Sequence, residues 1–457
     1  MTRRCVNVLV GLSLVFLSLS VHAVEFQSLG FDALSMGGAG VASSSGPFAP
    51  YYNPALLPEH KHKLQVSISA MAGYREVNVA EHIDALSEID IEDTIDQLAT
   101  GSGIDYSNLP TSAPNVGDSI PVTAPTDVKN DVSTIKRELR ALSVQNGIQL
   151  MPSVCLGIQN GNIGVGAYGV SEATAHAVID PNRLDLIYEH EDGGQTYYIE
   201  YNDVNNTFIR QSQAAYEARS FEYAIGGEGN TTYLQLTGLA YLEIPISYGH
   251  KFNTEFGELN CGGSFKLMPG YTYDYKSRID TESGDISDEL EDYQEKDTAY
   301  GVDLGLLFKP KTLSRLSIGL VGKNLNTPEF DKASGGTMEV DPQLRTGAAY
   351  DFPGGWVTLA FDADLTNNDT FIPGYNAQFM GGGINFHPFN WLSLRGGLMK
   401  NLKESDEGTI LTAGLGLGAK WLQLDVAAQY STEDGEYDGE KIPRYGKVQV
   451  ALVSKWF

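Results

Sequence analysis

Six charged residues in the second half of the chain lie in segments where polar and apolar positions alternate. Because successive side chains of a strand point to opposite faces, these charges would share a face turned away from the apolar residues. Such a face can line a polar path that selects a solute, or its charges can pair and fill a narrow interior. The six residues are Asp303, Arg345, Asp362, Asp364, Arg395 and Asp425. Pairing is the simpler interpretation, because a polar interior is general in barrels that cross membranes.

Few other residues carry recognisable chemistry. His60 and His62 flank Lys61, but no acidic or cysteine partner stands at ligand spacing, so no metal site is predicted. The acidic run 285–297 is typical of a solvated external loop, with weak Ca²⁺ or Mg²⁺ binding as the alternative. A barrel enzyme of the lipase type would need a serine and a histidine on its outer wall, and no such pair is evident. The sequence therefore predicts no enzymatic activity and no cofactor.

Alternation with a period of two residues recurs along most of the chain and predicts β-strands. Leu422 and Leu424 share one face, for example, and Gln423 and Asp425 share the opposite one. The segments are close to the length that crosses a bilayer when tilted. Fourteen strands are predicted, at about 63–72, 147–158, 163–172, 232–249, 258–276, 298–309, 314–323, 342–350, 356–366, 376–387, 391–399, 409–419, 421–431 and 446–457.

The connections between these strands alternate between short and long. Outer-membrane barrels have short periplasmic turns and longer external loops, and an even strand count places both termini on one side. A soluble β-sandwich, the alternative, would not require this asymmetry. The predicted fold is therefore an all-β, antiparallel transmembrane β-barrel of about 14 strands that occupies residues 59–457.

Residues 1–23 have the features of a signal peptide that is cleaved after export. Arg3 and Arg4 form its charged start, a short apolar core follows, and small residues precede a cleavage point after Ala23. The apolar core is shorter than the ~20 residues that a spanning helix needs. Export predicts a place in the outer membrane of a Gram-negative bacterium, among lipid and lipopolysaccharide.

The net charge excludes one class of function, and the cysteine content leaves two thiol states open. The formal net charge is -27, which argues against direct nucleic-acid binding, because that needs basic patches. Beyond the signal peptide the chain has two cysteines, Cys155 and Cys261, both in predicted strands. A disulfide between them and two buried free thiols are both compatible with the sequence.

Residues 24–58 precede the first strand and have no strand pattern, yet they carry many apolar and aromatic side chains. The lumen is the nearest place to bury these side chains, so we expect a hatch that plugs the barrel. Asn53-Pro54 would form a fixed turn in which Asn53 bonds to lumen-side groups. The residues assigned to the hatch site are Met36, Gly37, Gly38, Tyr51, Tyr52, Asn53 and Pro54.

The first long connection, about 73–146, predicts a helical insertion on the external side. Apolar residues recur at helical spacing within 82–98 and more cleanly within 132–142, on either side of an irregular linker at 107–126. We expect the two helices to fold over the barrel mouth. The alternative is that they only pack together as a surface decoration.

The pairing of Ser35-Met36-Gly37-Gly38-Ala39-Gly40-Val41-Ala42 with Tyr51-Tyr52-Asn53-Pro54-Ala55-Leu56-Leu57 resembles the start of FadL-type hydrophobic-compound transporters. That resemblance implies a hatch within a fourteen-strand barrel. Within this superfamily the chain is most similar to the TraF-like conjugal transfer outer-membrane family, through segments 31–42, 53–56, 322–328 and 340–347. A thioredoxin-like protein shares the TraF name, but this chain has no Cys-x-x-Cys motif.

Two functional hypotheses follow. The first is a transporter-like barrel that binds or passes a small hydrophobic compound. The second is an envelope component of DNA conjugation or surface assembly, in which the barrel is a scaffold and its loops contact proteins of the conjugation apparatus. A transporter should have an apolar pocket between hatch and loops, whereas a scaffold does not need one.

Overall fold

A computed structural model describes residues 24–44, 46–59, 64–89, 94, 115–120, 126–192, 194–226, 230–278, 293–418 and 421–456. The predicted signal peptide, His60, His62 and the acidic run up to residue 292 lie outside the described residues. Among the described residues, no helix is long and apolar enough to cross a membrane.

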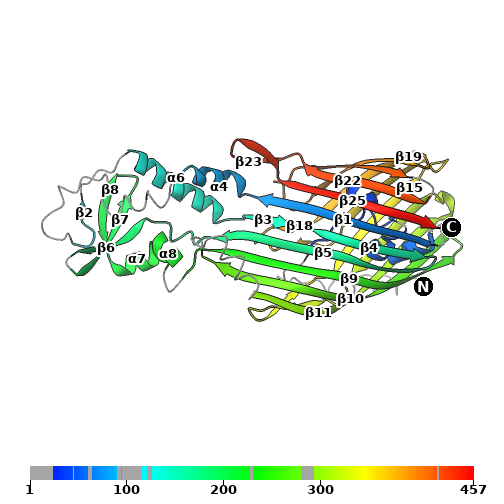
Figure 1. Cartoon of the computed structure of the whole chain (residues 1–457), viewed down its shortest axis with the longest axis horizontal. Coiled ribbons are helices and arrows are strands. Elements are labelled where there is room, and N and C mark those ends of the chain that lie inside the picture. The colour runs from blue at the N-terminus through cyan, green and yellow to red at the C-terminus, as the bar shows by residue number, and fades with distance from the viewer. Residues whose placement is uncertain are drawn as a thin grey trace, which may run out of the picture.

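Fourteen antiparallel strands of the described chain close into one barrel, which confirms the predicted fold (Figure 1). Each strand pairs with the next, and the last pairs with the first, with Leu64 opposite Trp456 and Arg75 opposite Tyr445. The strands are β1 (Leu64–Val77), β3 (Gly147–Leu150) continued by β4 (Ser153–Asn160), β5 (Ile163–Val178), β9 (Tyr233–Asn253), β10 (Gly257–Ser277), β11 (Gln294–Pro310), β12 (Leu316–Lys323), β15 (Gln343–Asp351), β16 (Val357–Asp364), β19 (Phe379–Phe389), β20 (Leu392–Asn401), β21 (Ile410–Gly418), β22 (Leu422–Ser431) and β25 (Tyr445–Trp456).

The alternation seen in the sequence becomes an apolar outer wall and a polar inner wall. Leu424 is 43 % exposed, whereas the next residue, Asp425, is fully buried inside the barrel. Leu359 and Phe361 on β16 are also exposed, whereas Asp362, the residue after Phe361, is buried. Register is fixed by this pattern, because a slip of one residue would turn every charge toward the outside.

Several strands differ in extent from the prediction. The second strand is interrupted at Pro152, which has no N–H to give to the sheet; pairing with β1 resumes at Ser153 opposite Met71. β1 continues to Val77, β5 to Val178, and β11 already starts at Gln294. These ends remain paired after the alternation of apolar and polar residues has faded, so the sequence pattern did not mark them.

The two ends of the barrel differ. At one end, which we call the turn end, the strands are joined by short turns, and the C-terminus lies there (Figure 1). At the other, the loop end, the long connections form small hairpins. These are β13 (Glu329–Asp331) with β14 (Thr337–Glu339), β17 (Asn368–Asp369) with β18 (Asn376–Ala377), and β23 (Asp434–Tyr437) with β24 (Glu440–Pro443).

The first two long connections form a compact unit at the loop end, which we call the loop-end unit. It contains α4 (Ala80–Ser87), β2 (Ser119–Ile120), α6 (Thr126–Leu142), β6 (Ile187–Asp192), β7 (Gln195–Asn202), β8 (Thr207–Gln211), α7 (Gln213–Arg219) and α8 (Phe221–Gly226). Val132, Ile135 and Leu139 of α6 pack with Tyr201 and Phe208 of the small sheet. The predicted stripe on α6 is therefore a buried face.

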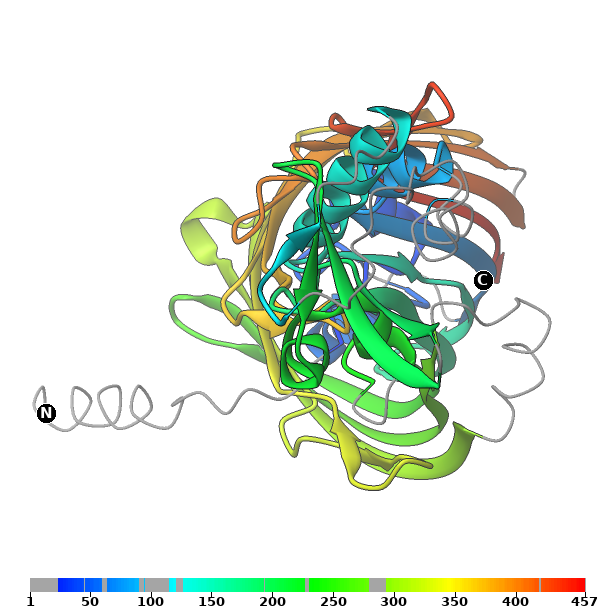
Figure 2. The same ribbon diagram turned by 90° about the vertical axis from the view of Figure 1, so that its left-hand side faces the viewer.

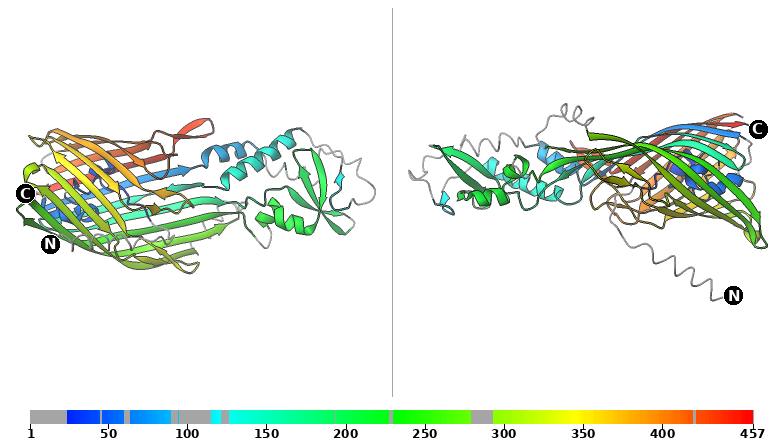
Figure 3. Two further views of the ribbon diagram at one scale, coloured as in Figure 1. Left: turned by 180° about the vertical axis from the view of Figure 1, so that it is seen from behind. Right: turned by 90° about the horizontal axis from the view of Figure 1, so that it is seen from below.

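One expectation about this region was wrong. The helices project beyond the barrel along its long axis and do not fold over its mouth (Figures 1 and 3). The view onto the loop end shows the small sheet and its helices in front of the barrel (Figure 2). The second long connection, 173–231, for which the sequence predicted no elements, forms strands that pair with one another and cover α6. The sequence of this connection is rich in tyrosine and acidic residues and lacks a clean alternation of apolar and polar positions, so it did not predict these strands.

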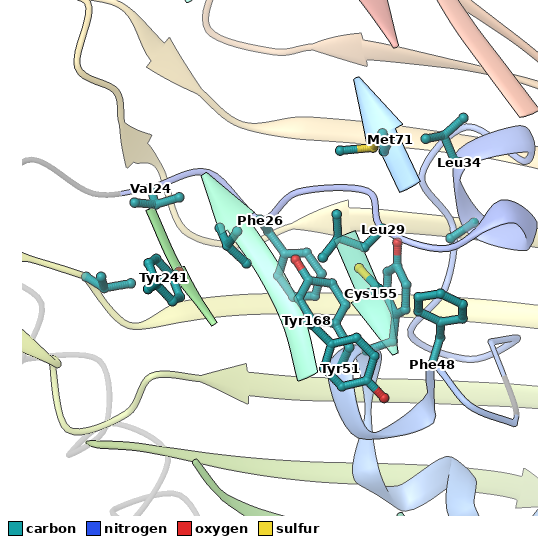
Figure 4. Packing of buried hydrophobic residues seen from close by; sticks show 14 of the residues in the cluster. Val24, Phe26, Leu29, Leu34, Phe48, Tyr51, Met71, Cys155, Tyr168 and Tyr241 are labelled. Atoms are coloured by element: carbon teal, nitrogen blue, oxygen red, sulfur yellow. The ribbon is translucent and has the colours of Figure 1, made fainter. Parts of the chain in front are cut away.

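Residues 24–58, the hatch, lie inside the barrel toward the turn end, as the dark blue ribbon in Figure 1 shows. Their helices are short: α2 (Phe31–Ser35), α3 (Ala49–Tyr52) and the 3₁₀ turn η1 (Pro54–Glu59). Val24, Phe26 and Leu29 of the hatch pack with Tyr168 and Tyr241 of the wall (Figure 4). This burial removes from water the apolar surface that the hatch sequence would otherwise expose.

Candidate functional site: the hatch and the inner wall

The glycine cluster of the hatch makes a tight turn that lies directly against the barrel wall. Gly37 has a φ of +67°, which a residue with a side chain rarely adopts. Its N–H donates to the hydroxyl of Thr412 at 3.0 Å. A Cβ placed on Gly383 of β19 would lie 2.6 Å from the Cα of Met36, so hatch and strand meet backbone to backbone. Gly383 pairs with Gly397 of β20, which contacts the same turn.

A buried carboxylate holds the next part of the hatch. Asp362 Oδ2 accepts hydrogen bonds from the N–H groups of Gly40 at 2.7 Å and Val41 at 2.9 Å. These donors belong to a turn outside regular secondary structure, so they need a partner once they are buried. Asp362 was predicted to line the lumen, and its position there orients the hatch.

Asn53 joins two parts of the hatch to the wall. Its Nδ2 donates to the carbonyl oxygens of Val41 at 3.0 Å and of Leu306 on β11 at 3.1 Å. Its Oδ1 accepts from the N–H of Ala55 at 3.0 Å, across Pro54. The predicted bond from Asn53 to a lumen-side group is thus confirmed.

Aromatic rings of the hatch lie against cations of the wall. Lys323 Nζ is 3.4 Å from the ring centre of Tyr51 and 4.8 Å from that of Phe26. The guanidinium of Arg345 lies 4.0 Å from the Phe26 ring. Such contacts are worth ~0.5–2 kcal/mol each, most where water is excluded. Tyr52 packs edge-on against Tyr51, with ring centres 5.2 Å apart.

The six predicted lumen charges are all buried and all have polar partners. Arg395 contacts Asp425 at 2.8 Å and Asp32 of the hatch at 2.7 Å. Arg345 contacts Asp364 at 2.5 Å. The remaining member, Asp303, pairs with a lysine on β10, Lys266, at 2.9 Å. Paired charges, and not an open polar path, fill the described lumen at these positions.

A further buried charge cluster, which was not predicted from the sequence, lies at the loop-end side of the hatch. Arg75 contacts Glu25 at 2.7 Å and Glu407 at 2.5 Å, and Lys447 contacts Glu25 at 3.2 Å. Arg75 is completely buried and also lies over the rings of Tyr375, Phe379 and Tyr445. Lys447 alternates with the outward valines of β25, so its inward direction was readable. Nothing in the sequence indicated that Lys447 pairs with Glu25 of the hatch.

Directly after the hatch, the last residue of η1 binds the wall at the turn end. Glu59 contacts Lys251 at 2.7 Å and also pairs with Lys309. Burial raises the pKa of Glu59, but hydrogen bonds from Lys251, Lys309 and Asn260 outweigh it and hold this pKa at about 2. The link therefore stays charged at every physiological pH.

An apolar groove of about 910 Å³ lies on the outer wall, behind the glycine turn of the hatch. It crosses β12, β15, β16, β19 and β20. Its sides carry Leu359, Phe361 and Leu398, and the outward-facing Gly382 and Gly396 line it between them. On the inner side of the same strands, Gly383 and Gly397 contact Met36 and Gly37. At this place the wall between groove and hatch carries no side chains.

Neither described cysteine takes part in a disulfide, because Cys155 and Cys261 are both free thiols. Cys155 is buried next to the hatch, where Figure 4 shows it beside Tyr168. The remaining hatch-site residue, Gly38, donates its N–H to Ala33 O at 2.8 Å and closes α2.

Comparison with known proteins gives one family match. The model of the family described as "F plasmid transfer operon, TraF, protein" matches residues 50–364. No curated protein matches the chain. Among solved structures, the Ralstonia pickettii toluene transporter TbuX is 13 % identical, with a TM-score of 0.47 over 94 % of this chain and 98 % of that one. The Pseudomonas putida toluene transporter TodX is 12 % identical, with a TM-score of 0.45 over 95 % and 100 % of the two chains.

Proposed function

The chain belongs to the F plasmid transfer operon TraF protein family, and from this premise we propose that it is an outer-membrane barrel that binds or passes a small hydrophobic compound. The apolar outer wall, with side chains such as Leu398 and Leu424 turned outward, would contact the lipid of that membrane. The turn end would lie in the periplasm and the loop-end unit outside the cell.

The groove behind the hatch carries this proposal. It is lined almost entirely by apolar groups, and it faces the side from which a hydrophobic compound dissolved in lipid would arrive. Its position differs from the expected one, since the sequence-based hypothesis placed the apolar pocket between hatch and loops. The Gly382 and Gly396 positions leave room for the ligand, and the glycine turn of the hatch would close the lumen behind it.

The hatch contacts suggest how such a barrel stays closed to other solutes. Asp362, Arg395 and Glu25 link the hatch to the wall through short, buried, charge-assisted hydrogen bonds. Water-soluble molecules would meet this plug in the lumen, whereas a hydrophobic compound would meet only the backbone of β19 and β20. Selection would therefore follow from polarity, without a dedicated polar site.

A scaffold in a conjugation or surface-assembly apparatus is the second candidate. The family description refers to a plasmid transfer operon, and the loop-end unit extends beyond the barrel, where it could meet partner proteins. The two functions differ in their use of the groove, because a scaffold would not require it to be free.

The test fills the groove without disturbing the hatch. A Cβ on Gly396 would meet only one atom, Thr412 O at 3.8 Å, so Gly396→Phe adds a ring to the groove with little strain. Gly263→Phe is the matched control, because Gly263 also faces outward with loose neighbours, on β10 and away from the groove. We expect Gly396→Phe to weaken binding of an environment-sensitive naphthylamine probe to the barrel in lipid vesicles about tenfold, or ~1.4 kcal/mol.

The control variant should bind the probe as the unchanged protein does. If both variants bind equally well, the groove is not the site and the transporter proposal fails. A third variant lacks the loop-end unit. If this variant binds the probe normally but no longer supports plasmid transfer, the scaffold function is favoured instead.

A further inference from the structure

The loop-end unit contains a cavity of about 340 Å³ between β6, β7 and the helices α7 and α8. Three tyrosines and three glutamates line it, together with a glutamine. The lining residues are Tyr198, Tyr216, Tyr223, Glu189, Glu217, Glu222, Gln213 and also Gly226. Its volume falls in the range of small-molecule sites, and it lies well away from the hatch and the outer-wall groove.

The three tyrosines form a connected aromatic wall. The ring centres of Tyr198 and Tyr216 are 4.9 Å apart, and those of Tyr216 and Tyr223 are 5.5 Å apart. Tyr216 is 93 % buried by the protein, being 7 % exposed, yet its hydroxyl has no hydrogen-bond partner among the described residues. The hydroxyl oxygen itself is not enclosed by protein, and Tyr216 lines the cavity, so a ligand there could supply the partner that the described residues do not.

The carboxylates give the cavity a strong negative charge. Glu189, Glu217 and Glu222 form no ion pair within the part of the chain that the structure describes, and only Glu217 has a side-chain partner there, Gln213 at 2.8 Å. Burial raises the pKa of Glu222, and the neighbouring charge of Glu189 adds to this effect. A cation placed among the three glutamates would relieve their repulsion.

The geometry distinguishes between kinds of cation. No group of three or more carboxylate, imidazole or thiol side chains in the described chain is close enough to hold a metal ion. The space exceeds that of one ion, and aromatic rings recognise ammonium groups rather than hydrated metals. Tyr223 already has a cation over its ring, the guanidinium of Arg183 at 5.5 Å.

We propose that this cavity binds an alkylammonium cation, with the aliphatic part against the tyrosine rings and the charged nitrogens near the glutamates. A free polyamine and a lysine side chain of another protein share this chemistry. The three carboxylates favour a ligand with more than one positive charge. This inference does not depend on what the barrel passes, because the loop-end unit has its own core.

The experiment measures spermidine binding to the purified full-length barrel in detergent by titration calorimetry. Glu222→Gln removes a charge and keeps the shape, and should weaken binding about fivefold or more. Tyr198→Leu should weaken it between about twofold and thirtyfold, whereas Tyr198→Phe, which keeps the ring, should not. Glu436→Gln is the charge control, since Glu436 is exposed on the β23 hairpin, away from the cavity.

Three results would overturn the proposal. One is no measurable spermidine binding. Another is an equal loss of spermidine affinity in Glu222→Gln and Glu436→Gln, which would show that spermidine is attracted only by the net negative charge of the protein. The third is equal binding by Tyr198→Leu and Tyr198→Phe. A parallel titration with a tetralysine peptide separates the two sources: tighter binding of the peptide assigns the cavity to a protein lysine, and tighter binding of spermidine assigns it to a free polyamine.

Discussion

At the scale of single residues, the buried and half-buried acids of this barrel differ in whether a partner stabilises their charge. Asp362 accepts two backbone N–H groups of the hatch, and Asp364 is held by Arg345. Asp341, half-buried in the connection before β15, has no such partner among the described residues. Burial raises its pKa to about 6, and the charges of Glu339 and Asp369 add to the rise.

Asp341→Asn should therefore stabilise the folded barrel at pH 8 but not at pH 4. The pKa of the Asp341 carboxyl is 3.8 in the unfolded chain and about 6 in the folded one. The folded protein is therefore progressively destabilised as the pH rises from 3.8 to 6, and this destabilisation is complete above pH 6. After allowance for solvent screening we expect a gain of about 1 kcal/mol at pH 8.

The measurement is the temperature at which the folded band is lost on electrophoresis, taken at both pH values. Asp434→Asn, at an exposed position of β23, serves as the control and should not change this temperature. The same gain at pH 4 and pH 8 would show that Asp341 acts through packing and not through its charge.

At the scale of elements, the hatch and the strands depend on one another. The hatch has only short helices of its own, and its buried N–H groups are satisfied by wall residues such as Asp362 and Thr412. In turn, wall residues such as Arg75 and Arg395 would be left with fewer partners without Glu25 and Asp32. Breaking buried pairs of this kind is costly, typically ~3–5 kcal/mol.

Deletion of residues 27–57 should open the lumen. The shortened protein should show a higher ion conductance in planar bilayers than the complete one, because the remaining wall charges attract water into the interior. Replacement of 434–443 by a short turn is the control, since that hairpin lies at the loop end and not in the lumen. A deleted protein that inserts normally and conducts no more than the complete one would show that the hatch is not the plug.

At the scale of the whole molecule, the two ends of the barrel have different structures. The turn end holds the C-terminus and the anchored end of the hatch, and the loop end carries the loop-end unit and the hairpins. If the barrel is inserted as proposed, only the loop end is accessible from outside the cell.

Single cysteines introduced at Glu440 and at Pro353 test this orientation. Both positions are exposed, the first at the loop end and the second at the turn end. With Cys155 and Cys261 replaced by alanine, an impermeant maleimide should label the Glu440→Cys protein on intact cells. The Pro353→Cys protein should be labelled only after the cells are lysed. The reverse pattern would invert the topology.

The sequence by itself determined the number of strands, the face of each charge and the amphipathic stripe of α6. These features depend on local periodicity, so Asp425 could be assigned to the interior from its neighbours alone. The same logic applied to Lys447 and Glu243, which lie on the inward side although they were not singled out.

Only the tertiary structure decided which groups meet. Asp362 binds N–H groups of Gly40 and Val41, which lie more than 300 residues away in the chain, and no local pattern encodes that contact. The groove depends on two adjacent glycines on each of β19 and β20, with Gly383 opposite Gly397, while the hatch packs behind them. The tyrosine cavity likewise needs two helices and two strands to converge. Pairing across such distances is set by closure of the barrel and by packing inside it, and those act on the folded chain as a whole.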